Sequence, residues 1–239
     1  MEAILYLIPV TLGETGFERV LPEYNREVIR SLKYFLVENV RSARRFLKKA
    51  VPSIVIDELV LTELNEHTTP EAVAEMVAPL TAGESMGLLS EAGCPAVADP
   101  GADVVAIAQQ KGYRVRPLAG PSSILMALMA SGLNGQRFAF HGYLPIAAPK
   151  RLERLKTLEM RMAAEDETQI FIETPYRNNR LAADLIRICR PTTRLCIAAD
   201  ITGDGEMIQT RTVKDWKGNL PDLRKQPAIF LIYKGKSYG

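Results

Sequence analysis

Histidine and cysteine are scarce in this chain of 239 residues, which has two histidines and three cysteines. His67 and His141 lie far apart without the spacing of metal ligands, so a zinc site or a Ser-His-Asp mechanism is disfavoured. Gly83–Gly87 matches the Gly-x-Ser-x-Gly pattern of hydrolases, but a helix is predicted before it and a strand after it, the reverse of a nucleophile elbow. We therefore expect no metal site and no hydrolase chemistry.

The chain also lacks the features of an exported or membrane-spanning protein. No basic segment precedes the first apolar run, and no run approaches the ~20 apolar residues that span a membrane. The odd number of cysteines, Cys94, Cys189 and Cys196, without a Cys-x-x-Cys pair, is typical of a reduced interior. These absences predict a cytoplasmic protein that does not contact a membrane.

Basic residues are absent between Lys49 and Lys111, a stretch that contains ten acidic residues, although the net charge of the chain is only +2. Eight basic residues lie just before it, between Arg26 and Lys49, and a second basic cluster spans residues 150–161. Such segments are often solvated helix faces, and they are equally typical of a surface that binds a polyanion such as RNA. The sequence alone leaves both interpretations open.

Short apolar runs alternate with helical patterns along the whole chain, which predicts two α/β domains, 1–117 and 118–239. Thr69 and Pro70 are a typical N-cap and first residue of a helix that buries Val73, Met76, Val77 and Leu80 on one face. A helix over 124–130 is apolar on every face and is expected to be buried, whereas 150–164 is expected to be an exposed basic helix.

The segment Ser90–Gly101 is the most informative stretch. It follows the apolar run 86–89, precedes a helical pattern, and combines two prolines and two glycines with the carboxylates of Glu91 and Asp99. Ligands of open α/β sheets bind beyond the carboxyl ends of strands, where such loops lie. We therefore interpret Ser90–Gly101 as a ligand-binding loop.

Five segments in order resemble the tetrapyrrole methylase superfamily, and most of all its ribosomal RNA small subunit methyltransferase I branch, which methylates the 2′-hydroxyl of a cytidine ribose. The family's Ser-Asp-Ala-Gly-x-Pro…Asp-Pro-Gly loop is similar to Ser90–Gly101. Its strand that leads into Pro-Gly-Pro-Ser resembles Pro117–Ser122, and its Phe-x-Gly-Phe-Leu-Pro segment resembles Phe140–Pro145. Its Tyr-Glu-Ser-Pro-His-Arg and Ala-Arg-Glu-Leu-Thr segments resemble Ile172–Arg177 and Ala198–Thr202.

This resemblance implies two α/β domains with S-adenosylmethionine in the cleft between them, a homodimer, and an RNA or ribosomal subunit as substrate. It implies that Ala92, Gly93 and Pro95 let the backbone approach the cofactor, that Ser122 donates a hydrogen bond, and that Ala198 and 227–229 line the adenine. The residues predicted to bind the cofactor are Pro9, Ser90, Glu91, Ala92, Gly93, Pro95, Asp99, Ser122, Glu173, Thr174, Ala198, Pro227, Ala228 and Ile229.

The chain departs from the family pattern at Val10–Glu14, Asn39–Val40 and Asp200–Glu206, which belong to the substrate side. Two alternatives to RNA methylation therefore stay open: a methylase of a tetrapyrrole-like small molecule, and a non-catalytic protein that binds S-adenosylmethionine. A ribose hydroxyl has a high pKa, so a general base would help. The candidates are Glu38, Glu91, Asp99 and Glu173, and the sequence does not choose among them.

Overall fold

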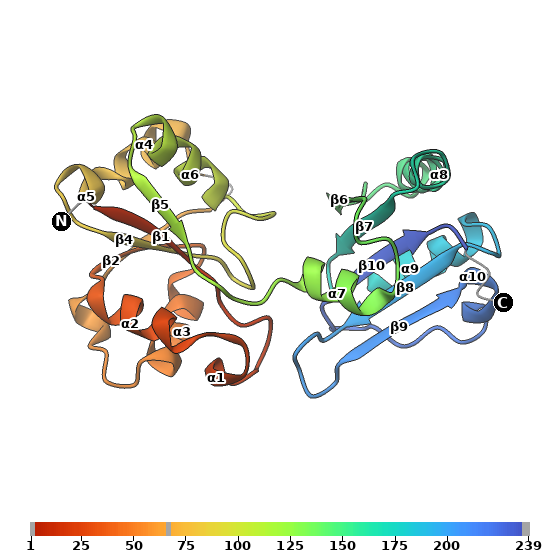
Figure 1. Ribbon diagram of the computed structural model, residues 1–239, viewed down its shortest axis with the longest axis horizontal. Helices are drawn as coiled ribbons and strands as arrows, with labels where there is room; N and C mark the ends of the chain where they lie inside the picture. The colour runs from red at the N-terminus through yellow and green to blue at the C-terminus, as the bar shows by residue number, and fades with distance from the viewer. Residues whose placement is uncertain (1–2, 66–67, 236–239) are drawn as a thin grey trace. The chain divides into compact units, whose positions relative to one another are not determined.

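The computed structural model describes residues 3–65 and 68–235, so His67 lies outside the described residues. The chain divides into two compact units, residues 1–122 and 123–239, whereas the sequence suggested a division after residue 117. Both units combine a five-stranded sheet with helices, so the predicted α/β class is confirmed (Figure 1).

The first unit is a parallel sheet in the order β3-β2-β4-β1-β5. Helices α2 and α3 cover one face and α4, α5 and α6 the other, each with its own apolar core (Figure 1). The elements are β1 Ile4–Ile8, α1 Phe17–Val20, α2 Glu23–Ser31, β2 Tyr34–Val37, α3 Val40–Ala50, η1 Ile56–Glu58, β3 Val60–Glu63, α4 Pro70–Met76, α5 Ala78–Thr81, β4 Met86–Leu89, α6 Gly101–Gln110 and β5 Arg114–Pro117.

Local capping explains where two of these helices begin. Asn39 accepts hydrogen bonds from the N–H groups of Arg41 and Ser42, so α3 begins at Val40. Thr69 caps α4 through the Ala72 N–H, as predicted. The single helix expected over 70–80 is interrupted at Val77, because Pro79 has no N–H to continue the backbone ladder and restricts the residue before it.

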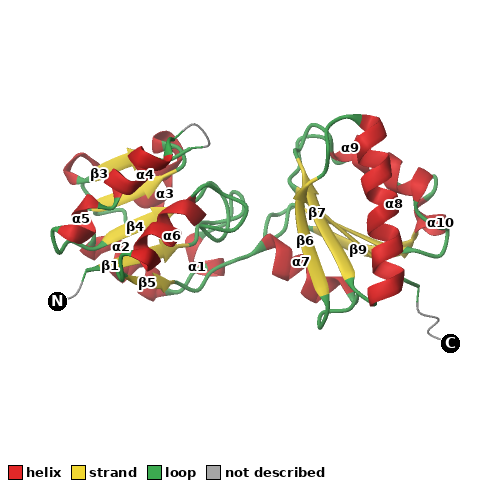
Figure 2. Cartoon of the chain, turned by 90° about the horizontal axis from the view of Figure 1, so that it is seen from above, coloured by secondary structure: helices red, strands yellow, loops and turns green. Residues whose placement is uncertain are grey.

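The second unit is a mixed sheet in the order β6-β7-β10-β8-β9, in which only β6 and β7 pair in parallel. Helices α8 and α9 lie on one side of the sheet and α7 on the other (Figure 2). The elements are α7 Ser123–Ser131, β6 Phe138–Tyr143, α8 Ala148–Glu165, β7 Thr168–Glu173, α9 Asn178–Ile188, β8 Arg194–Ala199, β9 Met207–Thr212, α10 Val213–Trp216 and β10 Ala228–Tyr233.

Two expectations about helix burial were wrong. Helix α7 packs on β9 and β10 through one side only, and Leu125 and Met129 are 50% and 82% exposed. An apolar sequence therefore does not ensure burial when a helix has a sheet on one side alone. Helix α8 is not simply an exposed basic helix, since it buries Leu155, Leu158 and the side chain of Arg151.

Candidate active site

The carboxyl ends of β1 and β4 form the topological switch point of the first sheet. The two strands are neighbours, but the chain leaves β1 over the face covered by α2 and α3, and leaves β4 over the face covered by α6. Ligands of open α/β sheets bind in the crevice that such an arrangement opens. The loops that begin at Pro9 and Ser90 flank this point, as expected for a ligand site.

The loops after β1, β4 and β5 pack against one another. The Val10 N–H donates to the Gly93 carbonyl at 2.9 Å, and the Cys94 thiol donates to the Pro121 carbonyl at 3.4 Å. A Cβ on Gly120 would lie 2.3 Å from the Cβ of Pro9, so only glycine permits this approach. The structure thus brings together the three loops that contain the predicted site residues of the first unit. These residues are Pro9 on the first loop, Ser90, Glu91, Ala92, Gly93, Pro95 and Asp99 on the second, and Ser122 on the third.

Asp99 holds the central loop in a conformation that its alanines disfavour. Ala96 and Ala98 have φ angles of 64° and 60°, in the left-handed region. Such a conformation costs a non-glycine residue about 1–2 kcal/mol. One oxygen of Asp99 accepts the N–H groups of Ala96 at 2.9 Å and Gly101 at 2.7 Å. Burial raises the pKa of Asp99, although these two hydrogen bonds oppose the shift. Its carboxylate therefore fastens the loop.

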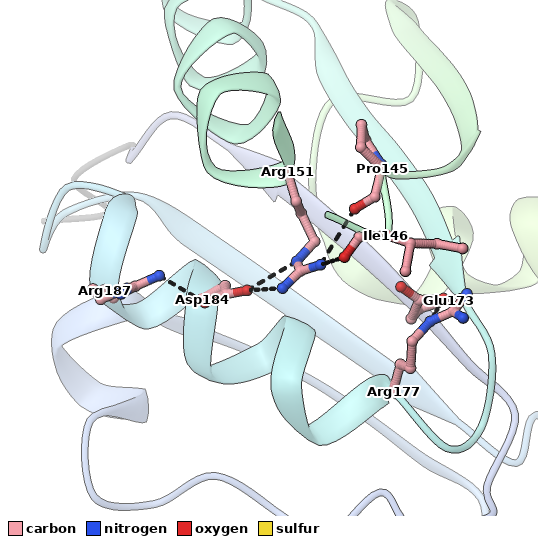
Figure 3. Close-up of polar contacts among 7 residues, drawn as sticks. All are labelled: Pro145, Ile146, Arg151, Glu173, Arg177, Asp184 and Arg187. Atoms are coloured by element: carbon pink, nitrogen blue, oxygen red, sulfur yellow. Dashed lines mark hydrogen bonds and ion pairs between the residues drawn. The ribbon is translucent and has the colours of Figure 1, made fainter. Parts of the chain in front are cut away.

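The Glu173 carboxylate is likewise bound by neighbouring groups of the protein. Its side chain is 1% exposed and pairs with Arg177 at 2.7 Å, while the same oxygen accepts the Thr174 N–H. Figure 3 shows this pair at the end of β7. One oxygen of Glu173 therefore binds both Arg177 and the Thr174 N–H, which fastens the turn after β7. We interpret Glu173 as a residue that holds this turn.

Glu38 and Glu91 lie together at the ends of the adjacent strands β2 and β4. The Glu38 carboxylate accepts the Glu91 N–H at 3.2 Å, and the exposed Glu91 carboxylate accepts the Ser42 hydroxyl. Burial raises the pKa of the half-buried Glu38; the Glu91 N–H opposes this shift, and the negative charges of Asp99 and Glu91 add to it. A raised pKa makes a carboxylate a stronger base. Asp99 shares this property, but one of its oxygens already accepts two N–H groups of its own loop, whereas Glu38 accepts the Glu91 N–H, so we favour Glu38 among the four candidates.

The predicted residues of the second unit also gather at one edge of their sheet. Because β10 runs antiparallel to β7 and β8, Ala228 lies opposite Glu173 and Ala199, and Ile229 opposite Ala198. The side chains differ in access, however. Pro227 is exposed and Thr174 half-buried, whereas Glu173, Ala198, Ala228 and Ile229 are buried. Contacts of these residues with a cofactor stay a prediction.

The departure from the family pattern at Asp200–Glu206 forms a loop that is fastened internally. Asp200 and Thr202 have φ angles of 48° and 69°. The Asp200 carboxylate accepts the Gly205 N–H at 2.9 Å, and the Glu206 carboxylate accepts the Thr202 N–H at 2.8 Å. These two hydrogen bonds fix the backbone of the segment between Asp200 and Glu206.

Sequence reasoning missed a buried ion pair next to this edge. Arg151 donates to Asp184 through Nε at 2.9 Å and Nη2 at 2.7 Å, and its Nη1 donates to the carbonyls of Pro145 and Ile146 (Figure 3). Arg151 thereby joins α8 and α9 to the segment that follows β6. It belongs to the basic cluster over 150–161 but contributes nothing to a surface charge, because its side chain is 2% exposed.

His141 lies within a hydrogen-bonded network on β6. Its Nε2 is 2.6 Å from Oε1 of the Gln169 side-chain amide, and its Nδ1 is 3.2 Å from the Arg154 guanidinium. Gln169 in turn donates to Glu167. A neutral imidazole that donates from Nε2 and accepts at Nδ1 satisfies both contacts. Burial lowers the pKa of His141, and the nearby charges of Arg154 and Arg161 add to this while Gln169 and Glu167 oppose it.

We expect the free energy of unfolding to fall as the pH decreases from about 7.5 to about 5.5, because an unfolded histidine, with a pKa near 6.5, then binds a proton that the folded one resists. Since the folded pKa of His141 is lowered, its contribution is present above the unfolded pKa and is lost as the pH falls. Urea denaturation of wild type and His141→Gln at both pH values measures this. An equal decrease in the two proteins would contradict the assignment to His141.

Residues 3–65 and 68–235, which the structure describes, contain no cluster of three or more His, Cys, Asp or Glu side chains suited to a metal ion. In the same ranges, no helix has the length and apolar character required to cross a bilayer.

Comparison with known proteins supplies the family context. The sequence model of the tetrapyrrole (corrin/porphyrin) methylases matches residues 24–216. A protein of *Vibrio cholerae* called ribosomal RNA small subunit methyltransferase I is 28% identical over 241 aligned positions, which cover 99% of this chain and 79% of the relative. A protein of the same name from *Xylella fastidiosa* is 33% identical over 224 positions, 94% of this chain and 75% of the relative.

Solved structures share the fold at low sequence identity. The methyltransferase CobJ aligns over 100% of this chain and 98% of its own, with a TM-score of 0.66 and 15% identity. Uroporphyrin-III-C-methyltransferase from *Thermus thermophilus* covers 98% of this chain and 93% of its own, with a TM-score of 0.56 and 21% identity. These likenesses support the two-unit α/β architecture and carry no statement about substrate.

Proposed function

This chain belongs to the tetrapyrrole methylase family and is a methyltransferase, and from that premise we propose that it transfers a methyl group from S-adenosylmethionine to small-subunit ribosomal RNA, at the ribose 2′-oxygen of a cytidine. The proposal of an RNA substrate rests on the shared name of the relatives. Proteins called ribosomal RNA small subunit methyltransferase I match 99% and 94% of this chain. The low-identity structural neighbours do not favour a tetrapyrrole substrate over RNA.

The loops of the first unit suit a cofactor bound mainly through the backbone. Glu91 and Ala92 are exposed at the carboxyl end of β4, and Gly93 has a φ of 74° that brings its backbone close to Leu12 and Pro121. S-adenosylmethionine would supply an electrophilic methyl group on a sulfonium. We propose that these loops hold it.

The chain's own contribution to the reaction would be positioning and proton removal. Holding an acceptor oxygen in line with a methyl carbon can supply up to about 7–11 kcal/mol in favourable cases. The hydroxyl proton must leave as the new oxygen–carbon bond forms, and Glu38 is the carboxylate whose surroundings suit this role. Asp99 and Glu173 would act by keeping the loops in place.

Binding of S-adenosylmethionine is expected to raise the free energy of unfolding by about 2.7 kcal/mol at one hundred times the dissociation constant. Thermal melts with S-adenosylmethionine, S-adenosylhomocysteine and ATP measure this, where ATP shares only the adenosine. No shift with either sulfur compound would refute the cofactor assignment.

The substrate is tested with small ribosomal subunits from a strain that lacks the gene. Purified protein and S-adenosylmethionine should restore one methyl group, which nucleoside mass spectrometry would locate on a cytidine ribose. Unmodified subunits after incubation, despite a positive cofactor shift, would refute the RNA substrate and leave a small-molecule acceptor or a non-catalytic role.

We further propose that the protein acts in the cytoplasm as a homodimer, as the family resemblance implies. The exposed apolar side chains of Leu125 and Met129, four residues apart on α7, are consistent with a buried position in an assembly. Light scattering of the purified chain measures its mass in solution, and a monomer at micromolar concentration would contradict this proposal.

A further inference from the structure

A pocket of about 290 Å³ lies beside the switch point of the first sheet. Its walls are the loop over 10–14, the start of the loop at Ser90, and one side of α3, which contributes Ser42, Arg45, Phe46 and Lys49. Only Ser90 and Glu91 also belong to the residues predicted to bind the cofactor. The loop over 10–14 is expected on the substrate side, and the side chains of α3 in this wall have no assigned role.

Three cations lie along one side of α3 at a spacing of four residues: Arg41, Arg45 and Lys49. Like charges at this spacing repel and destabilise a helix. Lys49 donates one hydrogen bond to the Thr15 carbonyl at 3.1 Å, which leaves two of its three donors. For Arg45, the described part of the chain offers no ion-pair partner. An anion at this wall would relieve the repulsion.

Arg44 and Lys48, each one position before Arg45 and Lys49, already have partners within the protein. Arg44 pairs with Asp57 at 2.8 Å, and Lys48 donates to the Ile54 carbonyl at 3.0 Å. The two sets of cations lie on the same helix, but Arg45 and Lys49 have more hydrogen-bond donors left for a ligand than Arg44 and Lys48. Variants of the second pair are therefore a matched control for variants of the first.

The pocket combines these cations with groups that recognise sugar hydroxyls. Glu14 and Glu91 provide carboxylate oxygens that accept hydrogen bonds from hydroxyls, Ser42 adds a hydroxyl, and the half-buried Phe46 adds an apolar wall. A phosphate, a ribose and a base need these three kinds of contact. A nucleotide can use the cations, the hydroxyl acceptors and the aromatic wall at once.

We propose that this pocket binds one nucleotide of single-stranded RNA, with Arg45 and Lys49 at its phosphate and Glu91 and Ser42 at its ribose. The inference rests on the proposed function and deepens it, because it places the acceptor nucleotide beside α3. The pocket reaches Glu91, whose backbone N–H contacts Glu38, so a ribose bound there lies next to the proposed proton acceptor.

The test compares the double variants Arg45→Ala/Lys49→Ala and Arg44→Ala/Lys48→Ala. The first is expected to raise KM for unmodified small subunits by about 10- to 100-fold. It should also reduce the slope of log affinity against log salt for a single-stranded RNA by about 0.7, the value for one lost phosphate contact. The second is expected to change both quantities much less. Arg45→Lys should restore part of the affinity.

Two outcomes would overturn the proposal: an unchanged KM and salt slope in Arg45→Ala/Lys49→Ala, or equal losses in the two double variants, which would indicate a diffuse electrostatic surface. Binding of S-adenosylmethionine, followed by its thermal shift, should remain at the wild-type level in both. That measurement distinguishes the two proposals. If only the assignment of the nucleotide to this pocket is wrong, binding of S-adenosylmethionine and methyl transfer are still observed.

Discussion

Replacing Glu38 with glutamine is expected to lower kcat for methyl transfer by about 10²–10⁴-fold, the range that a positioned general base contributes. Glutamine keeps a side-chain oxygen to accept the Glu91 N–H, which Glu38 accepts at 3.2 Å. It cannot take up a proton. The loss should therefore fall on kcat and kcat/KM alike, while the affinity for S-adenosylmethionine stays near that of the wild type.

The pH profile separates a base from a structural carboxylate. Because burial raises the pKa of Glu38, wild-type kcat/KM should increase as the pH rises through that pKa, when the carboxylate becomes ionised. Glu38→Gln should lose this rising limb. A profile of unchanged shape, or an unchanged kcat, would remove Glu38 from the mechanism.

Glu63→Gln serves as the matched control for this experiment. Glu63 lies opposite Val37 at the end of the neighbouring strand β3, and its carboxylate accepts a hydrogen bond from the side chain of Asn65. The variant removes one negative charge from the same edge of the sheet. It is expected to retain kcat, so a large loss there would show that net charge at this edge matters more than a base.

Arg151→Ala is expected to lower the free energy of unfolding by about 3–5 kcal/mol, as for other buried ion pairs that lose one partner. The guanidinium is 2% exposed, and its removal leaves the Asp184 carboxylate, 11% exposed, with Arg187 alone. It also leaves the carbonyls of Pro145 and Ile146 without their donor. Urea denaturation followed by circular dichroism measures the change.

Two further variants show where this effect comes from. Arg187→Ala removes the other arginine bound to Asp184, but that side chain is 60% exposed, so the loss should be about 0–1 kcal/mol. Arg151→Met/Asp184→Leu removes both buried charges and should be more stable than Arg151→Ala. A loss below about 1 kcal/mol in Arg151→Ala would contradict the anchoring role.

The central strands could be predicted from the sequence because they are short apolar runs with buried side chains. Met86–Leu89 and Ala228–Tyr233 are examples. Cap residues such as Thr69 also act locally, within one turn of helix. Burial of a helix face depends instead on what packs against it, which no local pattern contains. For this reason the apolar helix α7 was wrongly expected to be buried on all sides.

The site could be predicted in part, because local patterns locate its loops but do not contain the contacts between them. Loops after buried strands could be located, and parallel strands bring their carboxyl ends to one edge. The environment of Glu38 could not be read from the sequence, since it contacts Glu91, 53 positions away. The buried pair of Arg151 and Asp184 could not be predicted for the same reason, since the two residues are 33 positions apart. Which carboxylate is buried, and which is neutralised by a guanidinium, follows only from the folded arrangement.

The left-handed alanines of the loop over 90–101 have a thermodynamic consequence for ligand capture. Because Asp99 enforces this shape through Ala96 and Gly101, the conformational entropy of the loop is given up during folding rather than on association. A partner that meets a preorganised loop should associate rapidly and with a small change in heat capacity. Asp99→Asn, which weakens the clamp, should shift the entropy of association in the unfavourable direction.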